Sequence, residues 1–180
     1  MLAGRPLIFY AAAAARASGV VDRLILSTDS IEISELGRTL GIEVPFMRPA
    51  ELAHDDSPMQ PGLEDAVAEI EQQGWAPTIV VLLQPTAPLR RPDHLVRAVS
   101  TLRETGCDSV VSVVKVPSHF APHFVMRIEG DRLLNFLPDG ATITRRQDVT
   151  PAYSRDGTVY AFRRDVLMDR RSIYGSDCRP

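Results

Sequence analysis

The feature that most constrains the fold is a short, wholly apolar run that recurs between segments of helical periodicity. Residues 78–83 and residues 109–114 are both rich in Val, Ile and Leu and lack the polar alternation of a half-exposed strand. A strand that is apolar at successive positions is buried on both faces, which is typical of a sheet covered by helices on both sides. The sequence therefore predicts a three-layer α/β fold with a mostly parallel sheet.

The segments between these runs carry helical patterns and helix-ending residues. Gly19 follows an alanine-rich segment, and Gly106 closes a segment that Pro92 opens, as is usual at helix ends. In chain order we expect a helix at Pro6–Ser18, a strand within Val20–Thr28, a helix from Asp29 to Leu40, a proline-rich loop at Val44–Pro61, a helix with Leu63, Ala66, Val67 and Ile70 on one face, the strand Thr78–Leu83, the helix after Pro92, and the strand Ser109–Val114.

Beyond residue 115 a hairpin pattern replaces the alternation. Two apolar segments, Phe124–Ile128 and Arg132–Phe136, flank a turn at Gly130, which predicts a β-hairpin. A strand over Thr158–Phe162 and a short helix near Asp165 are expected to follow.

We expect one domain over residues 1–180, in which residues 117–157 form an excursion from the main sheet. Apolar side chains in that excursion need a partner surface, which favours a homodimer. These side chains are Phe120, Phe124, Val125 and Phe136.

Composition excludes several classes of function. The chain has 180 residues, 44% of them hydrophobic, and a net charge of −3, so it can bury a core but lacks the cationic excess of a nucleic-acid or membrane-surface binder. No apolar run approaches the ~20 residues of a membrane span, and the apolar stretch Leu7–Ala17 lacks the features of a secretory signal. Cys107 and Cys178 have no CxxC partner, which favours free thiols in a reducing compartment. We therefore expect a cytoplasmic protein.

Candidate ligand-binding residues lie where the expected strands end. Arg48, between residues that resist helix formation, could read a base edge or a phosphate, or could be a surface arginine paired with Glu51 or Asp55. Asp55, Asp56 and Ser57 could bind a sugar hydroxyl or a metal, or could form the N-cap region of a helix. Gln84 follows a buried strand directly, where its amide suits a neutral polar ligand or braces the loop.

Two further groups have a functional and a structural interpretation. Arg145, Arg146 and Arg155 could capture a carboxylate or a phosphate, although a solvated charge run is the usual explanation. His119 and His123 are four residues apart, but the neighbouring prolines prevent one helix from aligning them, so we expect no metal site there. The chain also lacks GxxxxGK[ST], GxGxxG, GxSxG and HExxH, which argues against P-loop kinases, common dehydrogenases and the best-marked hydrolases.

Seven sequence blocks, taken in order, resemble the acylneuraminate cytidylyltransferases, or CMP-sialic acid synthetases. The resemblance covers nearly the whole chain. The blocks are Leu2–Ile8, Leu26–Ser30, Glu43–Ala53, Val81–Arg90, Asp108–Val113, Arg145–Asp148 and Asp156–Tyr160.

This resemblance implies a Rossmann-like nucleotide-diphospho-sugar transferase fold. It implies transfer of CMP from CTP to an acidic nine-carbon 2-keto sugar, with release of pyrophosphate and use of Mg²⁺. Carried over by position, Arg48 would contact the cytosine. The ribose pocket would be lined by Asp55, Asp56 and Ser57. The acidic sugar would be held by Gln84, Arg146, Arg155 and Tyr160. The resemblance assigns no catalytic residue and no metal ligand.

The chain departs from the family pattern in three places. The family's phosphate-binding loop would precede Leu2, and its Asp-Ile-Asp metal motif would lie near the C-terminus; neither occurs in these 180 residues. The family's Tyr-Arg-Pro-Asn-Gly corresponds to Tyr153–Gly157, with the arginine displaced by one position to Arg155. We therefore expect a chain shortened at both ends and slow in turnover. The alternatives are a non-catalytic binding or dimerisation module, and a cytidylyltransferase for a legionaminic or pseudaminic type of sugar.

Overall fold

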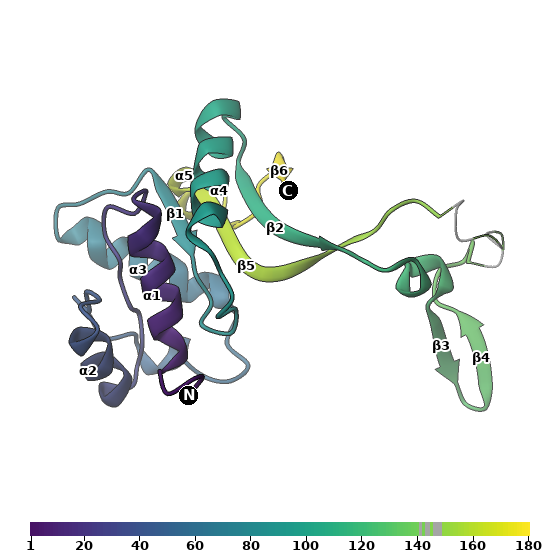
Figure 1. Cartoon of the computed structure of the whole chain (residues 1–180), viewed down its shortest axis with the longest axis horizontal. Helices are drawn as coiled ribbons and strands as arrows, with labels where there is room; N and C mark the ends of the chain where they lie inside the picture. Colours follow the sequence, from purple (N-terminus) through teal and green to yellow (C-terminus); the bar gives the residue numbers. More distant parts are fainter. Residues whose placement is uncertain (141, 143–144, 146–148) are drawn as a thin grey trace. The chain divides into compact units, whose positions relative to one another are not determined.

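The computed structural model of the chain describes residues 1–140, 142, 145 and 149–180. It consists of two compact units: Met1–Ser112 together with Gly157–Pro180, and Val113–Asp156 (Figure 1). That residues 1–180 make one domain stays a prediction. No helix in the described part of the chain is long and apolar enough to cross a membrane.

The first unit contains most of the regular structure. Its helices are α1 (Leu7–Ser18), α2 (Ile31–Thr39), α3 (Met59–Gln72), α4 (Pro92–Thr105) and α5 (Arg164–Met168), with a short 3-10 helix at Ala50–Leu52. Its sheet is formed by β1 (Ile79–Leu82), β2 (Ser109–Lys115), β5 (Tyr153–Arg163) and β6 (Cys178–Arg179), of which β2 and β5 continue into the second unit. The predicted helices, the apolar strands and the helix near Asp165 are confirmed; β6 was not predicted.

The sheet has the order β1-β5-β2-β6 and is mixed rather than mostly parallel. β1 pairs antiparallel with β5, so that Val80 lies opposite Phe162, whereas β2 and β6 are parallel. The prediction of a strand within Val20–Thr28 was wrong: the structure has only an isolated parallel bridge between Ile25 and Glu43. An apolar run becomes a strand only where neighbours pair with it, and pairing cannot be read from periodicity.

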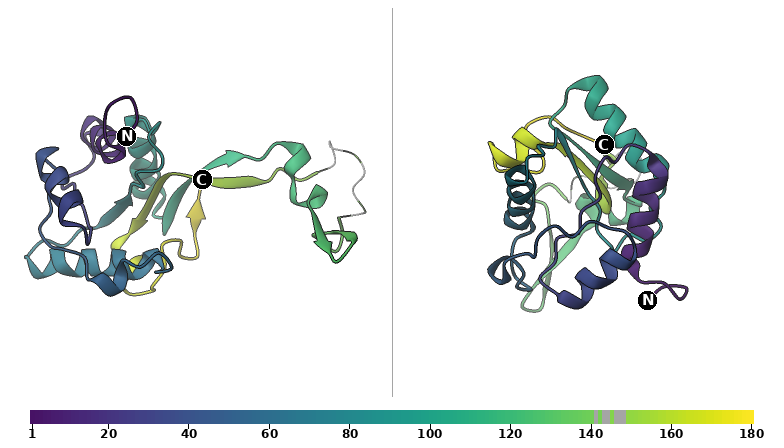
Figure 2. Two further views of the ribbon diagram at one scale, coloured as in Figure 1. Left: turned by 90° about the horizontal axis from the view of Figure 1, so that it is seen from below. Right: turned by 90° about the vertical axis from the view of Figure 1, so that its left-hand side faces the viewer.

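Two apolar layers lie on opposite faces of this sheet, which confirms the three-layer prediction. Alternate residues of β5 face opposite sides, as the strand period requires. One cluster joins α1 and α4 to the sheet through Ala15, Leu95, Ala98, Leu102, Val110, Val159 and Ala161. The other joins α3 and α5 to the sheet through Val67, Val111, Tyr160, Phe162, Leu167 and Ile173. Figure 2 shows α1 and α4 on one side of the strands and α3 and α5 on the other.

The ends of the helices follow their local sequence. Gly19 and Gly106 both adopt the left-handed conformation just after α1 and α4, where glycine carries no steric penalty. Helix α2 is capped by Ser30, whose Oγ accepts a hydrogen bond from the amide of Ile33 at 3.3 Å. Asp29, the expected first residue of that helix, lies before the cap.

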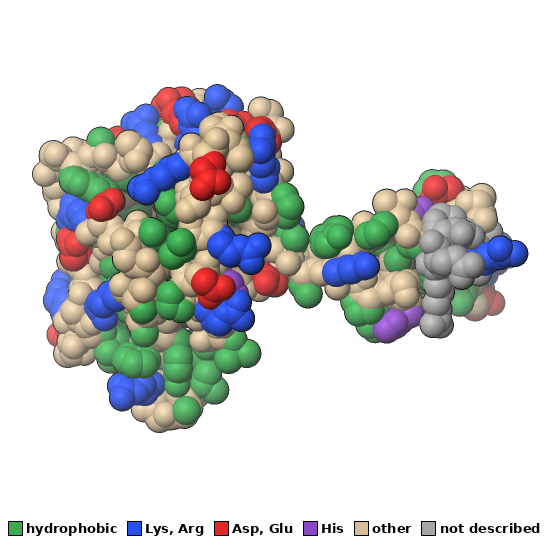
Figure 3. All heavy atoms as spheres, turned by 45° about the horizontal axis from the view of Figure 1, so that its top comes forward, with side chains coloured by type: hydrophobic (Ala, Val, Ile, Leu, Met, Phe, Trp, Pro, Cys, Tyr) green, Lys and Arg blue, Asp and Glu red, His purple; other side chains and the backbone are tan. Residues whose placement is uncertain are grey.

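The second unit is built around the predicted hairpin. β3 (Met126–Glu129) and β4 (Arg132–Asn135) pair antiparallel, and Gly130 in the turn has a φ of 64°. Two 3-10 turns, Ser118–Phe120 and Pro122–Phe124, precede it. Figure 3 shows hydrophobic side chains on the surface of this unit. The large exposed ones are Val114, Phe120, Val125, Met126, Ile128, Leu133, Phe136 and Tyr153.

Candidate functional site

Arg48 is held against the end of the Leu24–Thr28 segment. Its amide donates to the carbonyl of Thr28 at 2.9 Å, and its guanidinium donates to Ser27 twice, from Nε to Oγ at 3.0 Å and from Nη2 to the carbonyl at 2.9 Å. Within the described residues Arg48 forms no ion pair, and its Nη1 has no hydrogen-bond partner. The alternative of a surface arginine paired with Glu51 or Asp55 is therefore not what the structure shows. The remaining nitrogen of this fixed guanidinium, Nη1, is therefore left to donate to a ligand.

A pocket of about 200 Å³ lies beside this guanidinium. Its wall is formed by Arg48, by Leu52–His54, by Ser57–Met59 and by Gly62 and Leu63 at the start of α3. A Cβ added at Gly62 would lie 3.6 Å from Nε of Arg48, so a side chain longer than alanine would displace the arginine. The guanidinium thus leaves room for no more than a small side chain at this position of α3.

The structure brings only one of the three predicted ribose-binding residues, Asp55, Asp56 and Ser57, to this pocket. Ser57 lines the pocket, whereas Asp55 and Asp56 are exposed in the turn before it and do not. Helix α3 begins after Pro58 without a side-chain cap, so Ser57 does not act as its N-cap.

Gln84 is connected to the same pocket through a neighbour. It lies two residues beyond β1, and its Nε2 donates to the Sδ of Met59 at 3.7 Å. Met59 lines the pocket, but Gln84 itself does not. On its other side, Gln84 faces Gly157, where an added Cβ would lie 3.0 Å from Oε1. Gly157 has a φ of 74°, a conformation that favours glycine, and a Cβ at this position would push the side chain of Gln84 aside.

Arg90 is a site residue that the sequence reasoning missed. Only 6% of its surface is exposed, and its guanidinium donates to the carbonyls of Thr158 and, at 2.9 Å, of Gln84. A third contact reaches the carbonyl of Gly157 at 3.5 Å. This arginine fastens the loop after β1 to the start of the buried part of β5. The available signal was the adjacent pair Arg90 and Arg91 at the end of a proline-rich loop after a buried strand.

Of the remaining predicted sugar-binding residues, Tyr160 lies in the same unit as this pocket and does not line it. Tyr160 is 8% exposed and packs in the core with Phe162, opposite Leu82 of β1, because β5 is buried on both faces there. Arg155 is exposed and belongs to the second unit, and Arg146 lies outside the described residues.

The other candidate groups also have structural explanations. Nε2 of His123 lies 3.7 Å from a carboxylate oxygen of Asp139. In the part of the chain that the structure describes, no three His, Cys, Asp or Glu side chains are grouped to hold a metal ion. Cys107 is buried and Cys178 exposed, and both are free, as predicted.

A carboxylate with a strongly lowered pKa holds the C-terminal segment, in the same unit. Hydrogen bonds from the amides of Ser176 and Asp177 lower the pKa of Asp108 to about 2, with a further contribution from Arg170. This carboxylate is 7% exposed and ties the segment before β6 to the start of β2. These hydrogen bonds hold the segment in place, and they account for the lowered pKa without a catalytic role for Asp108.

The first unit thus combines a mixed α/β sheet with a pocket beside a fixed arginine, between the loop at Leu52–Ser57 and the start of α3. The chain matches the model of the cytidylyltransferase family over residues 1–175, and it belongs to that family.

Two relatives illustrate the match. The chain is 30% identical to the CMP-N,N'-diacetyllegionaminic acid synthase of Legionella pneumophila, over 100% of this chain and 76% of that protein. It is also 30% identical to the N-acylneuraminate cytidylyltransferase of a serotype V strain of Streptococcus agalactiae, over 97% of this chain but only 41% of that protein.

The fold resembles that of a solved CMP:2-keto-3-deoxy-manno-octonic acid synthetase complexed with CTP. The TM-score is 0.68 and the identity 18%, over 95% of this chain and 68% of that one. At this identity the likeness establishes the fold, which confirms the predicted class of nucleotidyltransferase fold.

Proposed function

We propose that this protein transfers CMP from CTP to an acidic nine-carbon 2-keto sugar and releases pyrophosphate. The observation that carries the proposal is the fixed guanidinium of Arg48 beside a pocket that Ser57 also lines, in a chain of the cytidylyltransferase family. The names of the relatives support an N-acylneuraminate or a legionaminic-type acceptor.

In this proposal Arg48 and Ser57 recognise the nucleoside. Two of the guanidinium's nitrogens are bound to Ser27, so Nη1 has a fixed direction and can donate to an acceptor of the cytosine edge without losing further side-chain entropy. The hydroxyl of Ser57 can bond the ribose, with Asp55 and Asp56 in the adjoining turn.

Gln84 is assigned to the acceptor sugar. Its amide is positioned by Met59 on one side and by the close approach of Gly157 on the other. Arg155 and Arg146 are the proposed partners of the sugar carboxylate, because guanidinium groups bind carboxylates with two parallel hydrogen bonds. Tyr160 supports this end of β5 from the core.

Mg²⁺ is the cofactor that the resemblance implies, and the described residues do not fit a protein-held metal. They contain no group of three metal-ligating side chains. The proposal therefore assigns Mg²⁺ no residue of this chain and derives no step through it.

The test is pyrophosphate release with CTP, Mg²⁺ and each of three acceptors: N-acetylneuraminate, diacetyllegionaminate and pseudaminate. We expect release with CTP and with at least one acceptor, and none when UTP or ATP replaces CTP. Arg48→Ala should raise the KM for CTP, whereas Arg97→Ala, on the exposed face of α4, should not. CTP binding without turnover of any acceptor would instead support a binding module.

We further propose a homodimer formed through the second unit, in a cytoplasmic protein. A two-stranded hairpin is marginal in water, and this one exposes 76% of Ile128 and 59% of Phe136. Ile128→Glu should lower the sedimentation coefficient to that of a monomer. Leu89→Glu places the same charge on a side chain that is 87% exposed in the first unit and should leave the coefficient unchanged. A wild-type chain that is monomeric at high concentration would refute the dimer.

A further inference from the structure

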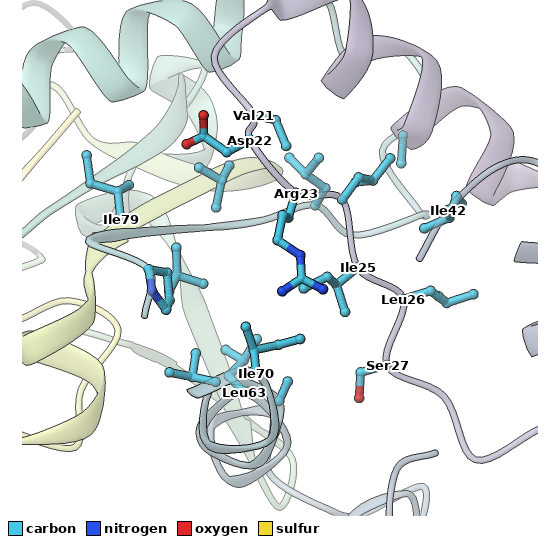
Figure 4. A pocket seen from close by; sticks show the side chains of 18 of the residues that line it. Val21, Asp22, Arg23, Ile25, Leu26, Ser27, Ile42, Leu63, Ile70 and Ile79 are labelled. Carbon is cyan, nitrogen blue, oxygen red and sulfur yellow. The ribbon is translucent and has the colours of Figure 1, made fainter. Parts of the chain in front are cut away.

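Met59, the first residue of α3, touches both the nucleotide pocket and the residue assigned to the sugar. Further along this helix, Leu63 and Ile70 line a second, apolar pocket of about 460 Å³ (Figure 4). Met59 does not line that pocket. It lines the 200 Å³ pocket beside Arg48 instead, and it is 40% exposed. A ligand in the Arg48 pocket would therefore cover this side chain.

The side chain of Gln84 turns toward Met59 and away from the apolar pocket. Leu83 and Pro85, on either side of Gln84, line the apolar pocket, whereas Gln84 does not. The backbone at this position is fixed, because the carbonyl of Gln84 accepts a hydrogen bond from Nη2 of Arg90 at 2.9 Å. The freedom that remains to Gln84 therefore lies in its side chain.

The sulfur of Met59 determines which way round the amide of Gln84 lies. A thioether can accept a hydrogen bond but cannot donate one, so it selects the Nε2 end of the amide, which donates to Sδ at 3.7 Å. Oε1 then lies on the side of Gly157 and, within the described residues, accepts no hydrogen bond. A sugar group bound at Oε1 must therefore be a donor, such as a hydroxyl or the N–H of an acylamino group.

We propose that Met59 is a positioning residue, through which a nucleotide in the Arg48 pocket orders the sugar site. The side chain of Met59 has three rotatable bonds and an exposed surface, so its sulfur can move when no ligand covers it. A nucleotide packed against Met59 restricts those bonds and fixes the sulfur as an acceptor, which holds Oε1 of Gln84 toward the sugar. The inference rests on the proposed function, for which it names the residue that links the two substrates.

The contact between the two side chains is tested in the ligand-free chain. Met59→Leu keeps an apolar side chain of similar volume and removes the acceptor. It should shift the side-chain amide signals of Gln84 in a proton–nitrogen correlation spectrum, where these signals are assigned by their loss in Gln84→Ala. Met47→Leu is the matched control and should not shift them, because Met47 is also 40% exposed but lines neither pocket. Unmoved Gln84 signals in Met59→Leu would overturn the inference whatever the activity of the enzyme.

The link between the sites is measured as the factor by which CDP tightens sugar binding. CDP brings the nucleoside but cannot release pyrophosphate, so N-acetylneuraminate, diacetyllegionaminate and pseudaminate can be titrated by calorimetry with and without it. One hydrogen bond is equivalent to about three- to tenfold in affinity, so the factor should be at least about threefold smaller in Met59→Leu than in wild type. Met59→Gln supplies an amide oxygen in place of the sulfur and should restore the factor. Met47→Leu should leave it unchanged.

A double-mutant cycle separates this role from a general disturbance of the pocket. In the Gln84→Ala background, Met59→Leu should lower the factor no further, because no amide is left to position. An equal factor in wild type and Met59→Leu, or an equal decrease with and without Gln84, would overturn the inference while the proposed transfer stands. A chain that does not bind CDP, or that binds none of the three sugars even with CDP present, would refute the proposed function and this inference with it.

Discussion

Removing the guanidinium of Arg90 should both destabilise the protein and loosen the proposed sugar site. Arg90 is buried, and its contacts are backbone carbonyls of two separate segments, the loop at Gln84 and the strand at Thr158. Arg90→Met keeps most of the volume of the side chain and removes the donors. The two carbonyls then lose a charged donor in a place where little water can replace it.

The magnitude follows from these contacts. A hydrogen bond to a charged group contributes about 1.5–3 kcal/mol, so the loss of two predicts a decrease of about 3 kcal/mol or more in the free energy of unfolding. For a chain of this length, that corresponds to a fall of roughly 6–12 °C in the midpoint of thermal unfolding. Arg90→Lys keeps the charge but not the planar fork, so it should lie between wild type and Arg90→Met.

The neighbouring residue supplies the control. The side chain of Arg91 is 65% exposed and pairs with Asp93 at the surface. Arg91→Met should therefore shift the midpoint by no more than about 2 °C. In the transfer assay, Arg90→Met should raise the KM for the sugar more than that for CTP, because its loop carries Gln84. Equal midpoints for Arg90→Met and Arg91→Met would refute the reasoning.

Three further outcomes are expected. Arg48→Lys cannot make both hydrogen bonds to Ser27 and should weaken CTP binding about tenfold, as measured by calorimetry. The circular dichroism spectrum should stay unchanged. Gly157→Ala should lower the free energy of unfolding by about 1–2 kcal/mol in urea titrations, because φ is positive there and the new Cβ meets Gln84. The lowered pKa of Asp108, about 2 against roughly 4 when unfolded, stabilises the fold fully above pH 4. That contribution should be lost as the pH falls toward 2, and acid titrations of Asp108→Asn should lack this loss.

The elements that could be predicted from the sequence are those whose limits are set locally. Pro92 and Gly106 bound α4, and Gly130 sets the hairpin turn, because each residue favours one backbone conformation whatever surrounds it. Strand direction has no such local signature. The antiparallel pairing of β1 with β5 joins residues about eighty positions apart, and the sequence of neither strand indicates whether its partner runs parallel or antiparallel to it.

The site shows the same division between local and long-range information. Arg48 and Ser57 could be chosen from their own loop, and the structure brings them to one pocket. Tyr160 is assigned to the sugar by the resemblance alone, yet it lies in a run whose apolar neighbours already indicate burial on both faces. Arg90 could not be assigned from its loop, since its function depends on carbonyls of a strand almost seventy residues away.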